Sequence, residues 1–324
     1  MPSRVARVRS LLARHPHALA VGQVVVLAAF FGIAGWAVRG QLHGAGERLR
    51  DASVAEFSLG CAVLAAYYLL FVLGWMWILG AWGVEIGYVA ALRAEMVSML
   101  AKYIPGGVWT PAARVVAARR AGVTDAGLVT ASILVEAGLS AVSGVLVFLV
   151  SLVWIDGVDQ PIWPVILFGG VVAVLLHPRV FQFVAGRVLR RFGTKLPPLP
   201  TRTLVGLLAY YAFTWLIGGA ALWFLVRSVG GRPDVDTIAF LGGTSAVGAI
   251  VAVLAIFAPS GLGPREGTMY ALLLAITGKS IALGTTVLNR AAITFVEVAL
   301  LLVGALVFRL RDDARALEAE VEGS

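Results

Sequence analysis

Seven long apolar segments restrict this chain to one kind of fold. They cover about residues 18–38, 55–82, 125–154, 162–177, 203–227, 237–258 and 281–308. A helix of about 20 apolar residues crosses the hydrocarbon core of a bilayer. The chain is 60% hydrophobic and only 14% charged, far from the composition of a soluble domain. We therefore expect an all-α integral membrane protein, with one membrane domain over residues 1–324 and no soluble domain.

The lysines and arginines of the connections predict the orientation of these segments. The first 14 residues hold four arginines, and the connection 178–202 holds six cations and no acid. The positive-inside rule places both in the cytoplasm. The connections around Asp156 and Asp234 have no excess of cations and are expected outside. The net charge of +8 is thus attributed to topology and anionic headgroups, and not to nucleic-acid binding.

Counting crossings against these orientations predicts two re-entrant hairpins. The run 18–38 is interpreted as an uncleaved first helix, because it is longer than the core of a signal peptide. If residues 86–120 enter and leave on the cytoplasmic side, the following helices alternate correctly. Residues 237–277 must then enter and leave on the outer side. The result is about six spanning helices plus two oppositely oriented hairpins, with both termini cytoplasmic.

Each hairpin turns at a motif that breaks a helix. The first is Lys102-Tyr-Ile-Pro-Gly-Gly-Val-Trp109, and the second is Ala258-Pro-Ser-Gly-Leu-Gly-Pro-Arg-Glu-Gly267. Proline and glycine interrupt helices, and interrupted backbone at membrane depth survives only beside protein or a water-filled cavity. Broken helices at corresponding places in two halves indicate a transporter binding site.

The spacing of charges after the two motifs suggests an inverted repeat. Glu136 follows Gly107 by 29 positions, and Arg290 follows Gly263 by 27 positions. Each hairpin is thus followed by a spanning helix with an ionisable group near its first third. Arg93 and Glu95, by contrast, are expected at the interface near the cytoplasmic end of the first hairpin.

The turns have the chemistry of an anion site. A helix that begins after a glycine turn offers free N–H groups and a partial positive charge, and arginine binds two phosphate oxygens at once. Ser260 or Gly261 is expected to cap the second half-helix, with Pro264 near its first turn. The predicted anion-binding residues are Lys102, Gly106, Gly107, Arg114, Ser260, Gly261, Gly263, Arg265 and Arg290.

Three carboxylates are the expected partners of these cations: Glu136, Glu266 and Glu297. Arg290 and Glu297 lie seven residues apart on one helix face, and Glu136 is a candidate partner for Arg290. The alternative is that these charges form static ion pairs between helices. Glycine pairs such as Gly218-Gly219 and Gly242-Gly243 are interpreted as close helix packing and not as phosphate loops.

Other chemistry finds little support in the sequence. The four histidines lie in or beside loops, and Cys61 is the single cysteine, so no metal site, cofactor or disulfide is expected. Walker and nucleophile-elbow motifs are also missing from the sequence. We expect that the protein is not an enzyme.

The two motifs, together with the order of the apolar segments, resemble the transmembrane region of the lysylphosphatidylglycerol synthase family. The motif Pro259-Ser-Gly-Leu-Gly-Pro-Arg-Glu266 followed by Arg290 carries this resemblance most specifically, although Ser260 stands where the family usually has glycine. The resemblance implies a flippase-like protein of the bacterial inner membrane. Its implied cargo is an anionic, aminoacylated or polyprenyl-phosphate-linked lipid.

Two alternatives to lipid movement stay open. An accessory protein would bind a polyprenyl-phosphate lipid for a cell-envelope glycosyltransferase without moving it. An intramembrane enzyme would modify the lipid with Glu266 as base, although no second activating group stands at suitable spacing. The expected partners are thus a membrane lipid, a glycosyltransferase or lipid synthase, and further copies of the chain.

Overall fold

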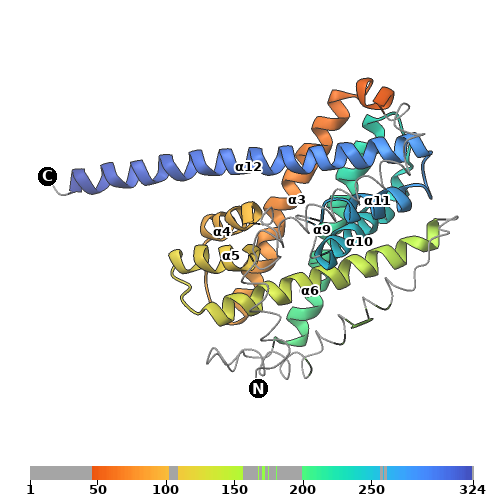
Figure 1. The fold of residues 1–324 in the computed structure, drawn as a ribbon. Helices are drawn as coiled ribbons and strands as arrows, with labels where there is room; N and C mark the ends of the chain where they lie inside the picture. The colour runs from red at the N-terminus through yellow and green to blue at the C-terminus, as the bar shows by residue number, and fades with distance from the viewer. Residues whose placement is uncertain are drawn as a thin grey trace, which may run out of the picture.

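A computed structural model describes residues 46–101, 109–155, 199–255, 258 and 261–322, together with five isolated positions between 167 and 180. All regular secondary structure in these ranges is helical (Figure 1). The longer helices are α3 (Val54–Ala81), α4 (Tyr88–Ala101), α5 (Trp109–Arg120), α6 (Ala126–Ser151), α9 (Thr201–Ser228), α10 (Ile238–Leu254), α11 (Pro264–Leu273) and α12 (Lys279–Glu322). Two short 3-10 turns, Leu152–Trp154 and Val235–Thr237, follow α6 and precede α10.

Five of these segments are long and apolar enough to cross a membrane: Val54–Ala81, Ala126–Ser151, Thr201–Ser228, Val235–Leu254 and Lys279–Gly304. They confirm a multi-pass, all-α membrane protein. Four of them coincide with predicted spans. The fifth falls within the predicted second hairpin, where α10 alone has the length of a crossing. The predicted spans 18–38 and 162–177 lie outside the described residues, apart from isolated positions in the second.

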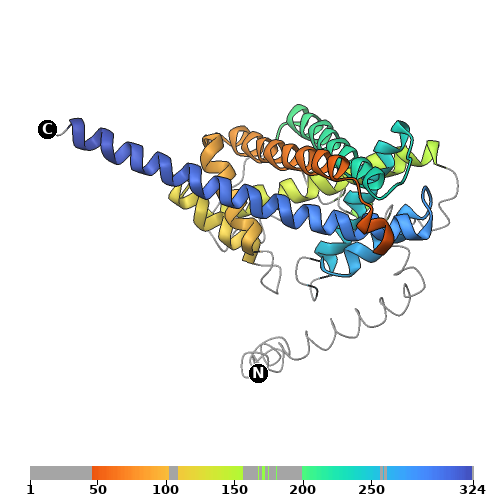
Figure 2. The ribbon, with the colours of Figure 1, turned by 90° about the horizontal axis from the view of Figure 1, so that it is seen from above.

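Helices α3 and α9 lie side by side as an antiparallel pair (Figure 2). At one end, the Ser53 N–H donates to the Ser228 carbonyl at 2.9 Å. Near the middle, the Tyr210 hydroxyl donates to the Leu70 carbonyl at 2.5 Å. Because residue numbers rise along α3 as they fall along α9, the two helices run in opposite directions.

The α10–α11 hairpin returns to the end of the bundle at which it leaves. A Cβ added to Gly231, just after α9, would lie 3.2 Å from Ile281 in the first turn of α12. A Cβ added to Gly284 would lie 3.5 Å from Val229. The end of α9 and the start of α12 are therefore neighbours, and everything between them goes into the bundle and comes back.

The α4–α5 hairpin also begins and finishes at one end of the bundle, which is opposite to the end used by the α10–α11 hairpin. Leu79 near the end of α3, Ile86 before α4, Val123 after α5 and Val129 at the start of α6 belong to one buried cluster. Since α3 runs from the Ser53–Ser228 contact to this cluster, the two hairpins enter the bundle from opposite ends. Figure 1 shows α4 and α5 to the left and α10 and α11 to the right.

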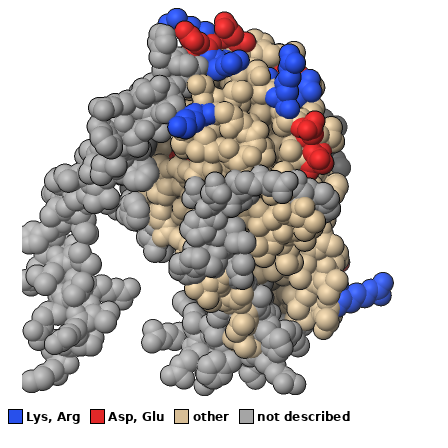
Figure 3. Space-filling view, turned by 90° about the vertical axis from the view of Figure 1, so that its right-hand side faces the viewer, with Lys and Arg blue, Asp and Glu red and all other residues tan. Residues whose placement is uncertain are grey.

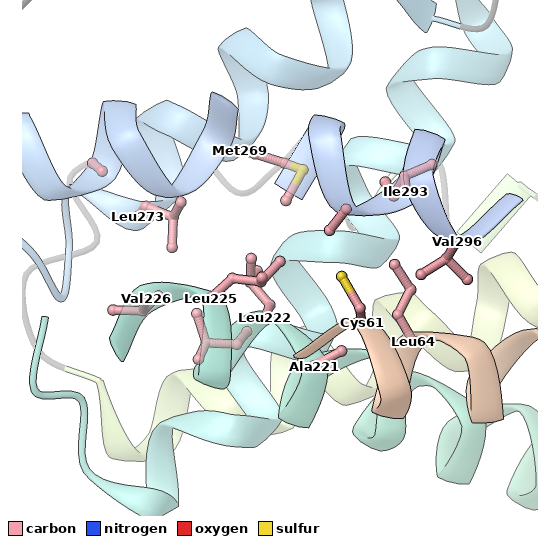
Figure 4. Close-up of a cluster of buried hydrophobic side chains, with 13 residues drawn as sticks. Cys61, Leu64, Ala221, Leu222, Leu225, Val226, Met269, Leu273, Ile293 and Val296 are labelled. Atoms are coloured by element: carbon pink, nitrogen blue, oxygen red, sulfur yellow. The ribbon is translucent and has the colours of Figure 1, made fainter. Parts of the chain in front are cut away.

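A second buried cluster joins α3, α9, α11 and α12. Cys61 and Leu64 from α3 meet Leu222 and Leu225 from α9, and Met269 from α11 packs beside them (Figure 4). On the face shown in Figure 3, the described residues are largely uncharged, and most of the charged side chains lie near its upper edge. Large apolar side chains such as Leu134, Phe213 and Phe295 are exposed on the long helices. This surface suits lipid as the solvent.

Helix α12 is a single helix of 44 residues. Its first part packs against α3, α9, α11 and α4, and its remainder extends beyond the bundle towards the C-terminus (Figure 1). At 1.5 Å per residue its length is about 66 Å, roughly twice the hydrocarbon thickness.

Close packing of α9 against α10 depends on one glycine from each predicted pair, Gly219 and Gly242. A Cβ added to Gly219 would touch the Ile238 carbonyl and lie 2.6 Å from Gly242 N, and one on Gly242 would lie 2.5 Å from the Trp215 carbonyl. These atoms belong to the backbone, which cannot rotate away. The interpretation as packing residues is thus confirmed for Gly219 and Gly242, and for Gly243, where a Cβ would lie 2.5 Å from Phe148 Cα on α6. Gly218, in contrast, has no close neighbour.

We predict that Gly219→Ala destabilises the purified protein by about 1–3 kcal/mol, because the added methyl group forces α9 and α10 apart. Thermal unfolding in detergent, followed by tryptophan fluorescence, measures the effect. Gly218→Ala is the matched control, since its Cβ would find its nearest neighbour at 3.8 Å. Equal melting temperatures for the two variants would contradict the packing argument.

Candidate functional site

Arg114 is the most deeply buried arginine among the described residues, at 4% exposure. It lies on α5, just inside the turn of the first hairpin. Its guanidinium forms ion pairs with Glu95 on α4 and with Glu136 on α6, and both carboxylates are themselves largely buried. We call these three residues the Arg114 cluster.

Aromatic side chains hold the Arg114 cluster in place. The guanidinium carbon of Arg114 lies 4.7 Å from the centre of the Trp75 ring on α3, a cation–π distance. Trp75 is itself fixed, because its Nε1–H donates to the Ser132 hydroxyl at 2.8 Å. On the other side, the Tyr211 hydroxyl of α9 lies 3.5 Å from Glu136 Oε1. Three long helices, α3, α6 and α9, therefore meet the first hairpin at this arginine.

The Arg114 cluster opens onto a cavity of about 430 Å³, which we call the central cavity. All of the elements around it are helices from both halves of the chain. Its lining residues are Tyr67, Phe71, Glu95, Ser98, Thr110, Arg114, Ile133, Glu136, Ala137, Gly138, Ser140, Ala141, Trp215, Ala249, Ile250 and Val253. One wall thus comes from α4 and α5 and carries charge, and the facing wall comes from α10 and is apolar. Both hairpins reach this cavity.

In the second hairpin, the acidic residue Glu266 caps the start of α11. Gly261 and Gly263 adopt φ values of +67° and +94°, which only glycine accepts readily, and α11 then begins with Pro264. Glu266 Oε2 accepts a hydrogen bond of 2.6 Å from the Gly263 N–H. The cap of α11 is therefore Gly263, and the prediction of Ser260 or Gly261 as the cap is wrong. The carboxylate of Glu266 already occupies this helix start.

Arg290 meets the same carboxylate from α12. Its Nη1 lies 3.5 Å from Glu266 Oε1. The pair borders a shallow groove on the outside of the bundle, lined by Leu262, Glu266, Val287, Arg290, Ala291, Thr294, Phe295 and Val298. Every other side chain of this groove except Thr294 is apolar, so the pair is the charged spot of a surface suited to lipid tails.

Arg265 and Glu297 lie around the tyrosines of α3. The Tyr68 hydroxyl donates to Glu297 Oε1 at 2.7 Å. Arg265 interacts electrostatically with both Tyr67 and Tyr68. Its buried Nε has no hydrogen-bond partner among the described residues. Tyr67 in turn lines the central cavity.

Several of the predicted residues have partners other than those expected from the sequence. Glu136 was the candidate partner of Arg290, but its carboxylate binds Arg114, and Arg290 binds Glu266. Glu95 was expected at the interface with Arg93; it instead belongs to the buried Arg114 cluster because the hairpin folds α4 against α5. Four predicted residues lie outside the described ranges: Lys102, Gly106, Gly107 and Ser260.

These features define a class of protein: a polytopic helical membrane protein with a charged cavity between broken helices. Residues 18–304 match the family model described as the lysylphosphatidylglycerol synthase TM region. The chain therefore belongs to this family, as its two motifs predicted. A comparison with curated proteins finds no match. Membership in this family indicates a role that involves membrane lipid.

We predict that Arg114→Met destabilises the protein by about 3–5 kcal/mol, because it leaves two buried carboxylates without their cation. Arg227→Met is the matched control. Arg227 also pairs with a glutamate, Glu56, at 2.8 Å and stacks 4.5 Å from Trp223, but its side chain is 42% exposed.

An exposed pair of this kind contributes at most about 1 kcal/mol. Denaturation of both purified variants in detergent measures the difference. A similar loss for the two substitutions would show that burial does not set the strength of the Arg114 cluster.

Proposed function

We propose that this protein is a lipid flippase-like transporter of the bacterial inner membrane, which moves an anionic, aminoacylated or polyprenyl-phosphate-linked lipid between the leaflets. The observation that carries the proposal is the central cavity, which both hairpins border and in which Arg114 is buried. A guanidinium in a cavity of low dielectric is a strong binding partner for a headgroup phosphate. The lipid tails would stay between the helices, in contact with the bilayer.

The order of elements supports two inverted halves. A long helix, a hairpin and a second long helix occur in α3, α4–α5 and α6, and again in α9, α10–α11 and α12. The first helices of the two halves, α3 and α9, have 28 residues each and run antiparallel. The hairpins enter from opposite ends. Repeats of this kind, with broken helices near the midplane, are typical of secondary transporters.

Ion pairs at corresponding places extend the similarity of the halves. Arg114 of α5 and Glu136 of α6 are 22 residues apart, and Glu266 of α11 and Arg290 of α12 are 24 apart. In each half the pair attaches the second helix of the hairpin to the next long helix, and the signs of the charges are reversed. Such pairs can break and re-form as the two halves move against each other.

The depth of the Arg114 cluster also suits a headgroup in transit. Glu136 is the eleventh residue of α6, which begins at Ala126. The rise of a helix places it about 15 Å along the axis, half the thickness of the hydrocarbon core. A charged site at the midplane is useful to a protein that passes a headgroup across, since the barrier for that headgroup is highest there.

We expect purified wild-type protein in liposomes to move fluorescently labelled phosphatidylglycerol between leaflets, measured as dye that becomes accessible to dithionite. Arg114→Ala should slow this movement at least about tenfold, since one charge-assisted contact contributes about 1.5–3 kcal/mol. Arg290→Ala tests the second ion pair, and Arg227→Ala is the surface control. Tight lipid binding without movement would favour the accessory role instead.

The membrane orientation of the hairpins has its own test. In a Cys61→Ala background, an impermeant maleimide added to intact cells should label Gly278→Cys, which follows the α10–α11 hairpin. Ala121→Cys, which follows the α4–α5 hairpin, should react only after the cells are opened. Labelling of Gly278→Cys only after lysis would overturn the opposite orientation of the two hairpins.

A further inference from the structure

The Arg114 cluster has one negative charge in excess, because two carboxylates share one guanidinium. The side chains are well shielded from solvent: Arg114 and Glu136 are each 5% exposed and Glu95 is 13% exposed. A buried charge without a partner is costly, and two carboxylates at one site do not both ionise freely. Within the described residues, the cluster therefore has one cation for two carboxylates before any ligand arrives.

Among the residues that the structure describes, the groups that face the Arg114 cluster from the surrounding helices do not supply that charge. Helix α3 presents Trp75 and Tyr67, and α9 presents Tyr211. Helix α10 contributes apolar side chains to the central cavity. Arg265 of α11 acts on Tyr67 and Tyr68, and Glu297 of α12 accepts the hydrogen bond of Tyr68. On α4 and α5, Arg93, Arg119 and Arg120 are exposed.

An anionic headgroup makes this imbalance larger. A phosphate that binds Arg114 brings a further negative charge into the cavity and draws the guanidinium away from Glu95 and Glu136. The carboxylates then face each other without their shared cation. The favourable way to restore balance is the transfer of a proton from water to one of the two carboxylates.

We propose that an anionic lipid headgroup enters the central cavity together with a proton, which Glu95 or Glu136 takes up. The inference rests on the proposed lipid-binding function and adds an energy source to it: a proton gradient across the membrane then biases the direction of lipid movement. No further cofactor is required, since the proton comes from water and returns to water when the headgroup leaves.

Because proton uptake is linked to lipid binding, the proposal predicts how the affinity for the lipid changes with pH. If one proton is taken up per lipid, the affinity falls by up to about tenfold for each unit of pH rise over the range in which the carboxylates titrate. We would measure the binding of dihexanoyl phosphatidylglycerol to the purified full chain in detergent by calorimetry, from about pH 5.5 to about pH 8.5. Two buffers with different ionisation enthalpies at each pH give the number of protons taken up.

The wild type should take up close to one proton per lipid. Glu95→Gln removes the excess charge, so its affinity should vary less than about twofold across the same pH range, with no proton uptake. Glu136→Gln should behave alike. Glu56→Gln, at the exposed pair with Arg227, should keep the proton uptake of the wild type.

The outcomes separate the two proposals. Binding by the wild type that is independent of pH and takes up no proton overturns the proton inference and leaves the proposed function standing. Failure of the wild type to bind the lipid at every pH overturns both. If the glutamine variants do not fold, the proton count of the wild type alone decides.

Discussion

A buried arginine must be surrounded by groups that stabilise its charge, and this requirement at Arg114 organises the first half of the bundle. Glu95 from α4 and Glu136 from α6 supply the carboxylates, and Trp75 from α3 supplies an aromatic face. These contacts add to the buried apolar cluster and fix the hairpin to both long helices that flank it. The position of α5, and with it one wall of the central cavity, follows from how this one charge is satisfied.

In the second half of the chain an ion pair also attaches the hairpin to the next long helix, but the positions of the cation and the carboxylate are exchanged. There the carboxylate, Glu266, belongs to the hairpin, and the cation, Arg290, belongs to the long helix. Glu266 also accepts the Gly263 N–H and so satisfies the start of α11, where a proline and two left-handed glycines have interrupted the backbone. A single side chain thus stabilises both the break in the helix and its attachment to α12.

The sequence predicted the features that depend on local pattern. Apolar length located the five described helices that are long enough to span, and proline with glycine marked the connections within both hairpins. Arg114, Glu136, Glu266 and Arg290 stood out because ionisable residues are rare in such segments. The sequence did not predict which of these charged residues form ion pairs. Glu136 pairs with Arg114 and not with Arg290, because α5 packs on α6. The position of Glu95 near one end of the predicted hairpin indicates an interfacial residue, and only the packing of α4 against α5 brings its carboxylate to Arg114.

The length of α12 connects events in the membrane to a point far from it. From Arg290 to Glu322 the helix is continuous, and the rise per residue makes this distance about 48 Å. A rigid rod of that length amplifies small rotations: a tilt of about 10° at Arg290 displaces the far end by roughly 8 Å. Any tilt of α12 about the Arg290–Glu266 pair would therefore be accompanied by a much larger displacement of its C-terminal end.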